Sequence, residues 1–249
     1  MSFVEVEHSN GIATVRLSRG KVNALNGTIV DELRERLHAL EGDQDPKALV
    51  LTGRGKFFSF GFDIPEFLSF AREEFTDFLT NFTELYTYLF LYPKPVVAAL
   101  NGHTIAGGFM LALACDNRIM AAGRGKVSLN EITFGSSVFA GSTEMLRFWV
   151  GSATATKVLC SGAMYSAEEA LGLGLVQEVM PEDQLMVRAR KIAGDLASRQ
   201  SSAFKSIKSL LRKPIAEDMI QREKGSIRAF VDIWYSKPTW ANLQDITIR

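Results

Sequence analysis

The chain has 249 residues, of which 47% are hydrophobic and 22% are charged, values that are ordinary for a soluble globular protein. Its 28 Lys and Arg residues balance 28 Asp and Glu residues, so no basic excess points to nucleic acid as a partner. The longest apolar stretch, 95–114, is interrupted by Asn101 and Gly102 and falls short of a membrane span. Cys115 and Cys160 both stand among apolar residues, which predicts reduced core thiols. With no signal peptide recognisable at the N-terminus, we expect a cytoplasmic protein.

The first half of the chain alternates between strand-like and helix-like hydrophobic patterns. Strands are predicted at 3–7 and 12–17, and the Asn10-Gly11 pair between them is typical of a hairpin turn. A helix is predicted from Thr28, because apolar residues then recur at helical spacing as far as Leu40. Further short apolar runs are typical of buried strands, at 48–52, 96–100 and 117–122. Strands separated by helices pair in parallel, so the pattern predicts an α/β core.

The later part of the chain is predicted to be mainly helical. Residues 166–169 form a capping box that starts a short helix, and Pro181 suits the first turn of another that runs to about Arg199. Two more helices follow, and they carry the large aromatic residues Phe230, Trp234 and Trp240. These side chains need covering, either by the core of the same chain or by another subunit.

Three segments that follow predicted strands contain residues suited to chemistry: 53–63, 101–108 and 128–135. The first two contain glycine, so their backbone N–H groups can approach a ligand closely. The second also starts a helix, where unpaired amides and the helix dipole favour negative charge. Two N–H groups that converge on one carbonyl oxygen would form an oxyanion hole.

Together with other stretches, these segments resemble the crotonase superfamily, which has the enoyl-CoA hydratase/isomerase fold. The similar stretches occur in the family's order along nearly the whole chain: 21–25, 58–63, 101–116 and 164–176. The resemblance implies a crotonase-like spiral core of ββα units at 1–195 that holds the active site. It also implies a helical region at 196–249 that packs on neighbouring subunits in a homotrimer or a dimer of trimers.

The resemblance also assigns roles to individual residues. The backbone N–H groups of Phe62 and Gly107 would form the oxyanion hole that holds the oxygen of an acyl-CoA thioester. Phe60 replaces the family's usual alanine, so its ring would reshape the acyl pocket, whereas Asp63 is expected to be structural. The residues expected to contact the substrate are Phe60, Gly61, Phe62, Asp63, Ile64, Gly107, Asn130 and Ala24.

The carboxylates distinguish the reactions of this family. Its hydratases use two glutamates to hold and activate a water, and these two positions correspond to Met110 and Glu131 here. A thioether cannot take a proton as a carboxylate does, so only Glu131 remains as a base. The Leu-Asn-Glu sequence that ends at Glu131 resembles that of the Δ3,Δ2-enoyl-CoA isomerases of β-oxidation. These enzymes move a proton from C2 to C4 with a single base.

The sequence analysis therefore predicts an enoyl-CoA isomerase that shifts a double bond from C3 to C2. Three alternatives stay open: a hydratase, a thioester hydrolase, and a non-catalytic acyl-CoA-binding paralogue. The three histidines, His8, His38 and His103, lack metal-ligand spacing, and no dinucleotide or phosphate-loop motif is present. We therefore expect no metal and no cofactor other than the coenzyme A of the substrate.

Overall fold

The computed structural model describes residues 2–246. Its main sheet has six strands in the order β1 (Val4–Ser9), β2 (Ile12–Leu17), β3 (Ala48–Gly53), β5 (Val96–Leu100), β7 (Asn117–Ala121) and β9 (Glu178–Met180). The β1–β2 hairpin is antiparallel, and every later pair in this sheet is parallel. Both the hairpin and the parallel α/β core are thus confirmed.

A second, smaller sheet lies beside the first and consists of β4 (Phe57–Ser59), β6 (His103–Ile105) and β8 (Val127–Ser128). Its strands pair in parallel, so their carboxyl ends lie along one edge. Strands β4 and β6 lie within the first two of the three segments selected from the sequence, 53–63 and 101–108, and β8 leads into the third, 128–135. The small sheet therefore brings the three segments together.

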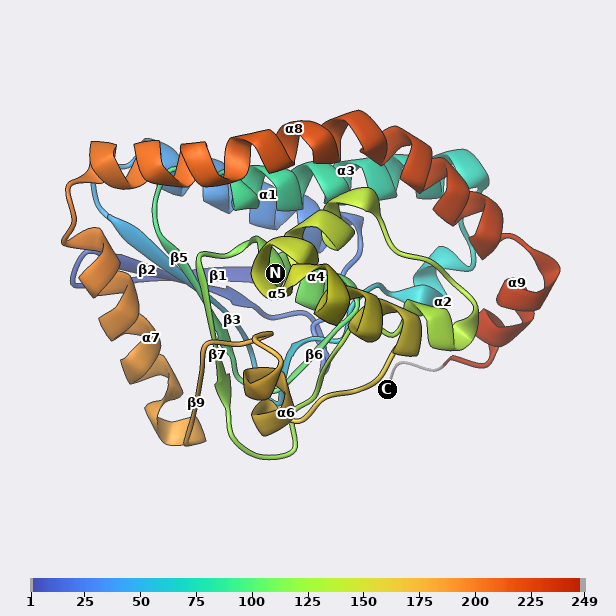
Figure 1. Ribbon diagram of the computed structural model, residues 1–249, viewed down its shortest axis with the longest axis horizontal. Helices are drawn as coiled ribbons and strands as arrows, with labels where there is room; N and C mark the ends of the chain where they lie inside the picture. The colour runs from blue at the N-terminus through green and yellow to red at the C-terminus, as the bar shows by residue number, and fades with distance from the viewer. Residues whose placement is uncertain (1, 247–249) are drawn as a thin grey trace.

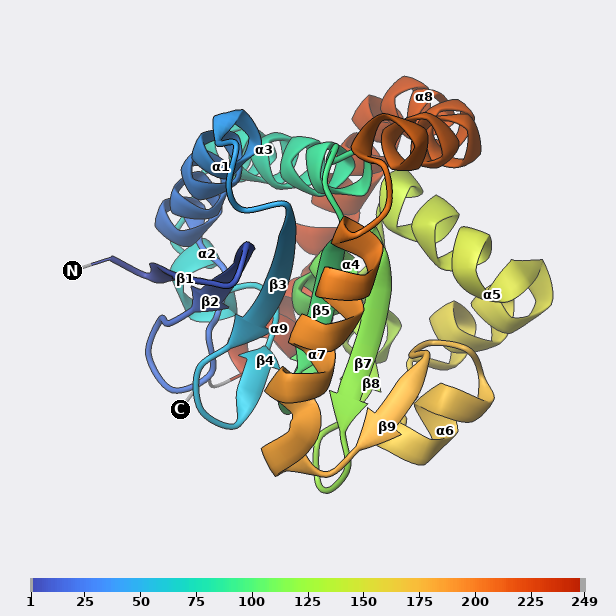
Figure 2. The same ribbon diagram turned by 90° about the vertical axis from the view of Figure 1, so that its left-hand side faces the viewer.

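Helices cover both faces of the main sheet (Figures 1 and 2). One face packs against α7 (Glu182–Ala197), whose Leu185, Ala189 and Ala193 are buried against β-strand side chains. The other face belongs to the larger core, to which several helices contribute, among them α1 (Gly27–Gly42), α3 (Arg72–Phe90), α4 (Gly107–Ala114) and α5 (Ala140–Ser161). Short helices α2 (Ile64–Phe67) and α6 (Ala167–Gly172) complete the central part.

The chain ends in α8 (Ser201–Trp234) and α9 (Lys237–Gln244), which are the two further helices predicted. In Figure 1, α8 runs alongside α3 across the top of the molecule. Phe230 and Trp234 are buried against this chain's own α3 and Phe139, so no second subunit is needed to cover them. The subunit packing predicted for 196–249 therefore does not follow from these aromatics, and the trimer stays a prediction.

Two local predictions were wrong. The N-cap of α1 is Asn26 rather than Thr28, because the Asn26 side chain accepts the hydrogen bond from the Ile29 N–H. Cys160 is exposed, since it lies on the outer side of α5, and only Cys115 is a core thiol. The predicted division of the chain into regions at 1–195 and 196–249 stays a prediction.

Candidate active site

Asn23 fixes the loop that follows β4. It is fully buried, and its side-chain amide donates hydrogen bonds to the carbonyls of Arg54, Phe57 and Phe58. The Ser59 hydroxyl donates to the Asn23 carbonyl at 2.8 Å. One buried amide thus ties together the chain on both sides of β4 and sets where the loop after it begins.

Beyond Ser59, the loop pairs with the chain just before α1. The Leu25 N–H donates to the Gly61 carbonyl, and the Asp63 N–H donates to the Leu25 carbonyl. This parallel bridge leaves the intervening N–H of Phe62 without an acceptor among residues 2–246. The Phe62 amide is therefore held in place but free to bind a ligand.

The second unpaired amide lies at the start of α4. Ala106 precedes this helix with a positive φ of 49°, a strained conformation for a residue with a Cβ atom. Its carbonyl accepts hydrogen bonds from the N–H groups of Phe109 and Met110. The Gly107 N–H has no acceptor in the described part of the chain, as expected for the first residue of a helix. The helix dipole adds partial positive charge at this position.

These two amides lie on loops that touch each other. A Cβ atom on Gly61, whose φ is 88°, would lie 3.0 Å from the Ile105 carbonyl oxygen and 3.3 Å from the Gly107 nitrogen. A Cβ atom on Gly107 would lie 2.9 Å from the Phe62 ring. Glycine is required at Gly61, because a side chain there would meet the backbone of the adjoining loop in a left-handed conformation, whereas a side chain at Gly107 would displace the Phe62 ring. The contact places two unpaired N–H donors on adjoining loops.

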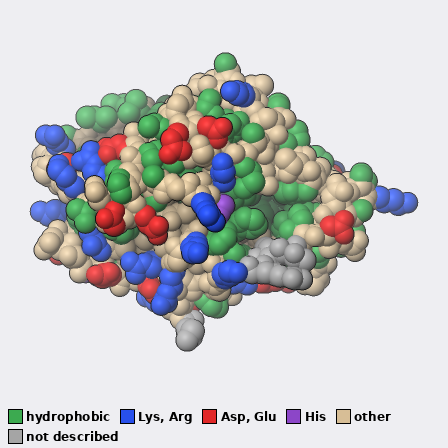
Figure 3. All heavy atoms as spheres, turned by 90° about the horizontal axis from the view of Figure 1, so that it is seen from below, with side chains coloured by type: hydrophobic (Ala, Val, Ile, Leu, Met, Phe, Trp, Pro, Cys, Tyr) green, Lys and Arg blue, Asp and Glu red, His purple; other side chains and the backbone are tan. Residues whose placement is uncertain are grey.

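A cavity of about 390 Å³ lies beside these loops. Its lining is largely aromatic and aliphatic: Phe60, Phe62, Ile64, Ile105, Ala106, Asn130, Glu131, Thr133, Phe134, Phe139, Phe230, Trp234 and Ile246. One face of the molecule is hollowed, with hydrophobic side chains in the hollow and Lys and Arg side chains along one side of it (Figure 3). An apolar cavity with few polar groups is the usual form of a small-molecule site.

Glu131 is the one carboxylate in this lining among residues 2–246. It begins the short 3-10 helix η1 (Glu131–Phe134) after β8 and is 4% exposed. Within residues 2–246, neither of its carboxylate oxygens has a hydrogen-bond partner, and the Oδ1 atom of its neighbour Asn130 also lacks one. Burial disfavours the charged form and raises the pKa of Glu131 to about 8. A buried, unpaired carboxyl group destabilises the folded state. Titratable groups in such environments cluster at functional sites, so Glu131 is a candidate for function.

The structure brings most of the predicted site residues together. Phe60, Phe62, Ile64, Asn130 and Glu131 line the cavity, and Gly61 and Gly107 form the contact between the loops. By contrast, neither Asp63 nor Ala24 is among the described residues that line it.

Asp63 has the structural role that was expected. Its side chain caps α2 by accepting from the Glu66 N–H, and it pairs with Arg19 at 2.7 Å. The Ala24 carbonyl accepts a hydrogen bond from the same guanidinium. Sequence reasoning missed Arg19, which lies before the motif and carries no pattern of its own.

Met110 and the aromatic residues of α8 differ in their relation to the cavity. Met110 is buried in α4, and it is not one of the described residues that line the cavity. The aromatic residues from α8 that line it, Phe230 and Trp234, were predicted only as tail residues that need covering. They lie about 100 positions from Glu131 along the chain, and no local pattern could join them to it.

Residues 7–238 match the enoyl-CoA hydratase/isomerase family. The chain belongs to this family. Its fold is also that of the human mitochondrial Δ3,Δ2-enoyl-CoA isomerase, with a TM-score of 0.93 and 27% identity over 98% of this chain and 96% of that one. The crotonase-like architecture predicted from the sequence is therefore confirmed.

Relatives within the family include both isomerases and hydratases at similar identity. The mouse mitochondrial enoyl-CoA delta isomerase 1 is 31% identical over 92% of this chain and 80% of its own length. A probable enoyl-CoA hydratase of Bacillus subtilis is 32% identical over 85% of this chain and 82% of its own length. Overall similarity thus supports enoyl-CoA chemistry, and the choice of reaction rests on the residues of the site.

The described helices include none that is long and apolar enough to cross a membrane. Relatives from mitochondria and from bacteria match equally well, so the cytoplasmic location stays a prediction.

Proposed function

We propose that this chain is a Δ3,Δ2-enoyl-CoA isomerase that moves a double bond from C3 to C2 of an acyl-CoA thioester. The observation that carries the proposal is Glu131, the one carboxylate among the described residues that line the cavity. Adding water across a double bond in this family calls for two carboxylates to hold and activate the water. An isomerase needs only one base, because the proton that it removes is the proton that it returns.

In the proposed reaction, the thioester oxygen accepts hydrogen bonds from the N–H groups of Phe62 and Gly107. Both donors are unpaired and lie on adjoining loops, and the Gly107 donor has the added field of the α4 N-terminus. As the C2 proton leaves, negative charge develops on this oxygen, and donors fixed in advance stabilise it. Each such donor is typically worth about 2.7–4 kcal/mol of barrier.

Glu131 would take the C2 proton as a carboxylate and return it to C4 as a carboxylic acid. The electron pair of the C2–H bond becomes the C2=C3 bond of the product, and the former C3=C4 pair forms the new C4–H bond. Burial without partners makes the carboxylate a stronger base than a solvated one, which suits both proton transfers. The scheme assigns no step to a metal or cofactor.

A direct absorbance assay distinguishes this function from its alternatives. Hex-3-enoyl-CoA should gain the absorbance of a conjugated enoyl thioester, while hex-2-enoyl-CoA should lose little of it. Rapid loss from hex-2-enoyl-CoA would instead identify a hydratase, and release of free thiol would identify a thioester hydrolase. Binding of acyl-CoA without any of these reactions would identify a non-catalytic paralogue.

A further inference from the structure

The far wall of the catalytic cavity comes from the C-terminal helix α8. Phe230 and Trp234 lie four residues apart on one face of this helix and are 2% and 1% exposed. The Phe230 ring lies 4.6 Å from that of Phe139, and the Trp234 ring lies 4.6 Å from that of Phe75. These rings are packed as closely as in a protein core, so Phe230 and Trp234 cannot move aside for a ligand without losing van der Waals contacts.

A continuous series of aromatic rings joins this wall to the oxyanion loop. Phe62, which carries one of the unpaired N–H groups, has its ring 6.3 Å from that of Phe139. Phe139 in turn contacts Phe230, which is 5.8 Å from Trp234. A thioester held at the Phe62 N–H would thus extend its acyl chain along these rings toward α8.

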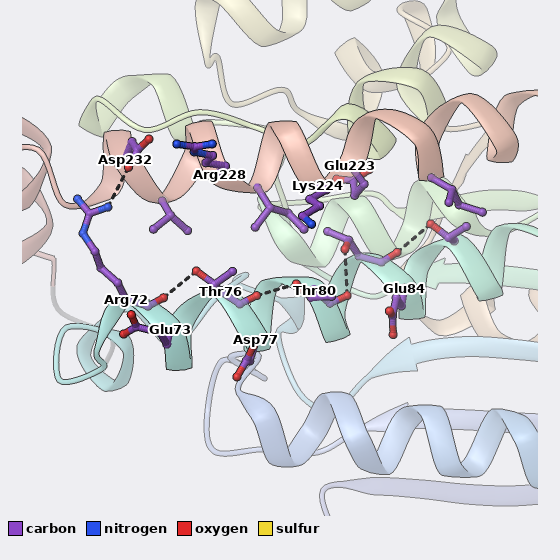
Figure 4. A pocket seen from close by; sticks show the side chains of 15 residues that line it. Arg72, Glu73, Thr76, Asp77, Thr80, Glu84, Glu223, Lys224, Arg228 and Asp232 are labelled. Carbon is purple, nitrogen blue, oxygen red and sulfur yellow. Dashed lines mark hydrogen bonds and ion pairs between the residues drawn. The ribbon is translucent and has the colours of Figure 1, made fainter.

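A larger groove of about 940 Å³ lies between α3 and α8 (Figure 4). Val231, the residue next to Phe230, lines this groove, whereas Phe230 lines the cavity. The described residues that line the two spaces have no member in common. Helix α8 therefore presents adjacent side chains to two separate spaces.

The inner surface of the groove is suited to a hydrocarbon chain. Thr76, Thr80 and Thr87 donate their hydroxyl hydrogen bonds to carbonyls one turn earlier in α3, so their polar groups are already satisfied. Ile227 and Val231 line the groove from α8. Charged side chains border it along its length, with Arg72 and Asp232 at one end and Arg228 and Lys224 farther along α8 (Figure 4).

We infer that Phe230 and Trp234 set the upper limit of acyl chain length by closing the cavity toward the α3–α8 groove. The inference rests on the proposed function of the cavity as an acyl-CoA site. A cavity of this volume lies at the small end of the range for ligand sites and must also hold the thioester. The preferred substrates are therefore short- and medium-chain enoyl-CoA thioesters, and longer chains are excluded by the aromatic wall.

The test compares kcat/KM for hex-3-enoyl-CoA and hexadec-3-enoyl-CoA in four proteins: wild type, Phe230→Ala, Phe230→Leu and Val231→Ala. Val231 is the matched control, because it is also buried on α8 but faces the groove. The Leu variant keeps more of the core volume and guards against failure of the Ala variant to fold. In the folded Phe230 variants, the ratio of long-chain to short-chain kcat/KM should rise roughly tenfold or more. In Val231→Ala, the ratio should stay at its wild-type value.

Calorimetric binding of hexanoyl-CoA and hexadecanoyl-CoA to the same proteins separates this inference from the proposed function. Absence of isomerase turnover in the wild type, together with a shift in the binding preference of the Phe230 variants, would refute the isomerase and support the length limit. Equal wild-type binding of both acyl-CoA thioesters would overturn the length limit. So would an unchanged preference in the folded Phe230 variants.

Discussion

The Arg19 guanidinium lies 2.7 Å from the carboxylate of Asp63, the residue that follows the unpaired Phe62 amide. The same guanidinium donates to the Ala24 carbonyl and reaches Glu66 at 3.0 Å. It therefore joins the chain on both sides of the bridge between Leu25 and Phe62. Among the described residues, the side-chain hydrogen bonds of Arg19 reach none that lines the cavity, so we regard it as a positioning residue for the Phe62 N–H.

Replacing Arg19 by methionine should lower kcat by about 10–100-fold, because small displacements of a catalytic donor are costly. KM should change much less. Infrared spectra should show a weaker shift of the thioester carbonyl band on binding, a signal that reports hydrogen bonding to that oxygen. Arg19→Lys should restore part of this shift.

Arg54→Met is the matched control for Arg19→Met, since Arg54 forms an exposed ion pair with Glu5 away from the cavity. It should leave both kcat and the carbonyl band unchanged. A normal carbonyl band in Arg19→Met would show that Arg19 does not position the oxyanion donor.

The pKa of Glu131 predicts the pH dependence of the reaction. The base must be ionised to accept a proton, and burial raises its pKa to about 8. The value of kcat/KM should therefore rise with pH and level off above about pH 8. A profile that is already flat from pH 6 upward would contradict the burial of an unpaired base.

The same buried carboxyl group should lower the stability of the folded protein. Its pKa is about 8 when folded, against an ordinary value of 4.5, so the folded state binds more protons between these values. The contribution of Glu131 to the free energy of unfolding therefore falls as pH rises through that window, and the destabilisation is complete above about pH 8. Glu131→Gln should raise Tm at pH 8.5 by at least roughly 2–4 °C, with a smaller effect at pH 5. An equal Tm for the two proteins at both pH values would refute the argument.

The predicted trimer can be tested through the outer face of α8. Leu210 and Leu211 are 76% and 57% exposed in the single chain. Neighbouring large apolar side chains that are exposed in this way often mark a contact between subunits. We expect a native mass of three or six chains, and Leu210→Glu should reduce it. Lys213→Glu, on the same helix at an already polar position, is the control. A wild-type protein that elutes as a monomer would contradict the prediction.

The regular parts of the fold followed from hydrophobic patterns. The strands at 12–17 and 96–100 have the predicted bounds, because the first follows a turn and the second follows a proline and buries a continuous apolar run. The N-cap of α1 was placed two residues late because Thr28 and Asn26 are both good caps. Only the hydrogen bond from the Ile29 N–H distinguishes them.

The site was predictable where its residues lie in short motifs. Phe62, Gly107 and Glu131 each follow a strand of the small sheet, so parallel pairing brings them to one edge. The wall formed by Phe230 and Trp234 was not predictable, because only tertiary packing of α8 on α3 brings it to the cavity. Arg19 was missed for a related reason, since its partners Asp63 and Glu66 are more than 40 residues away.

The central claim is that Glu131 is the single base of an isomerase, and the conversion rate of hex-3-enoyl-CoA by Glu131→Gln tests it most directly. Glutamine keeps the size of the side chain but cannot accept the proton. Turnover should fall by roughly 10²–10⁴-fold, the typical effect of losing a general base. Hexanoyl-CoA binding, measured by calorimetry, should change little. A folded Glu131→Gln protein that converts hex-3-enoyl-CoA at nearly the wild-type rate would contradict the account.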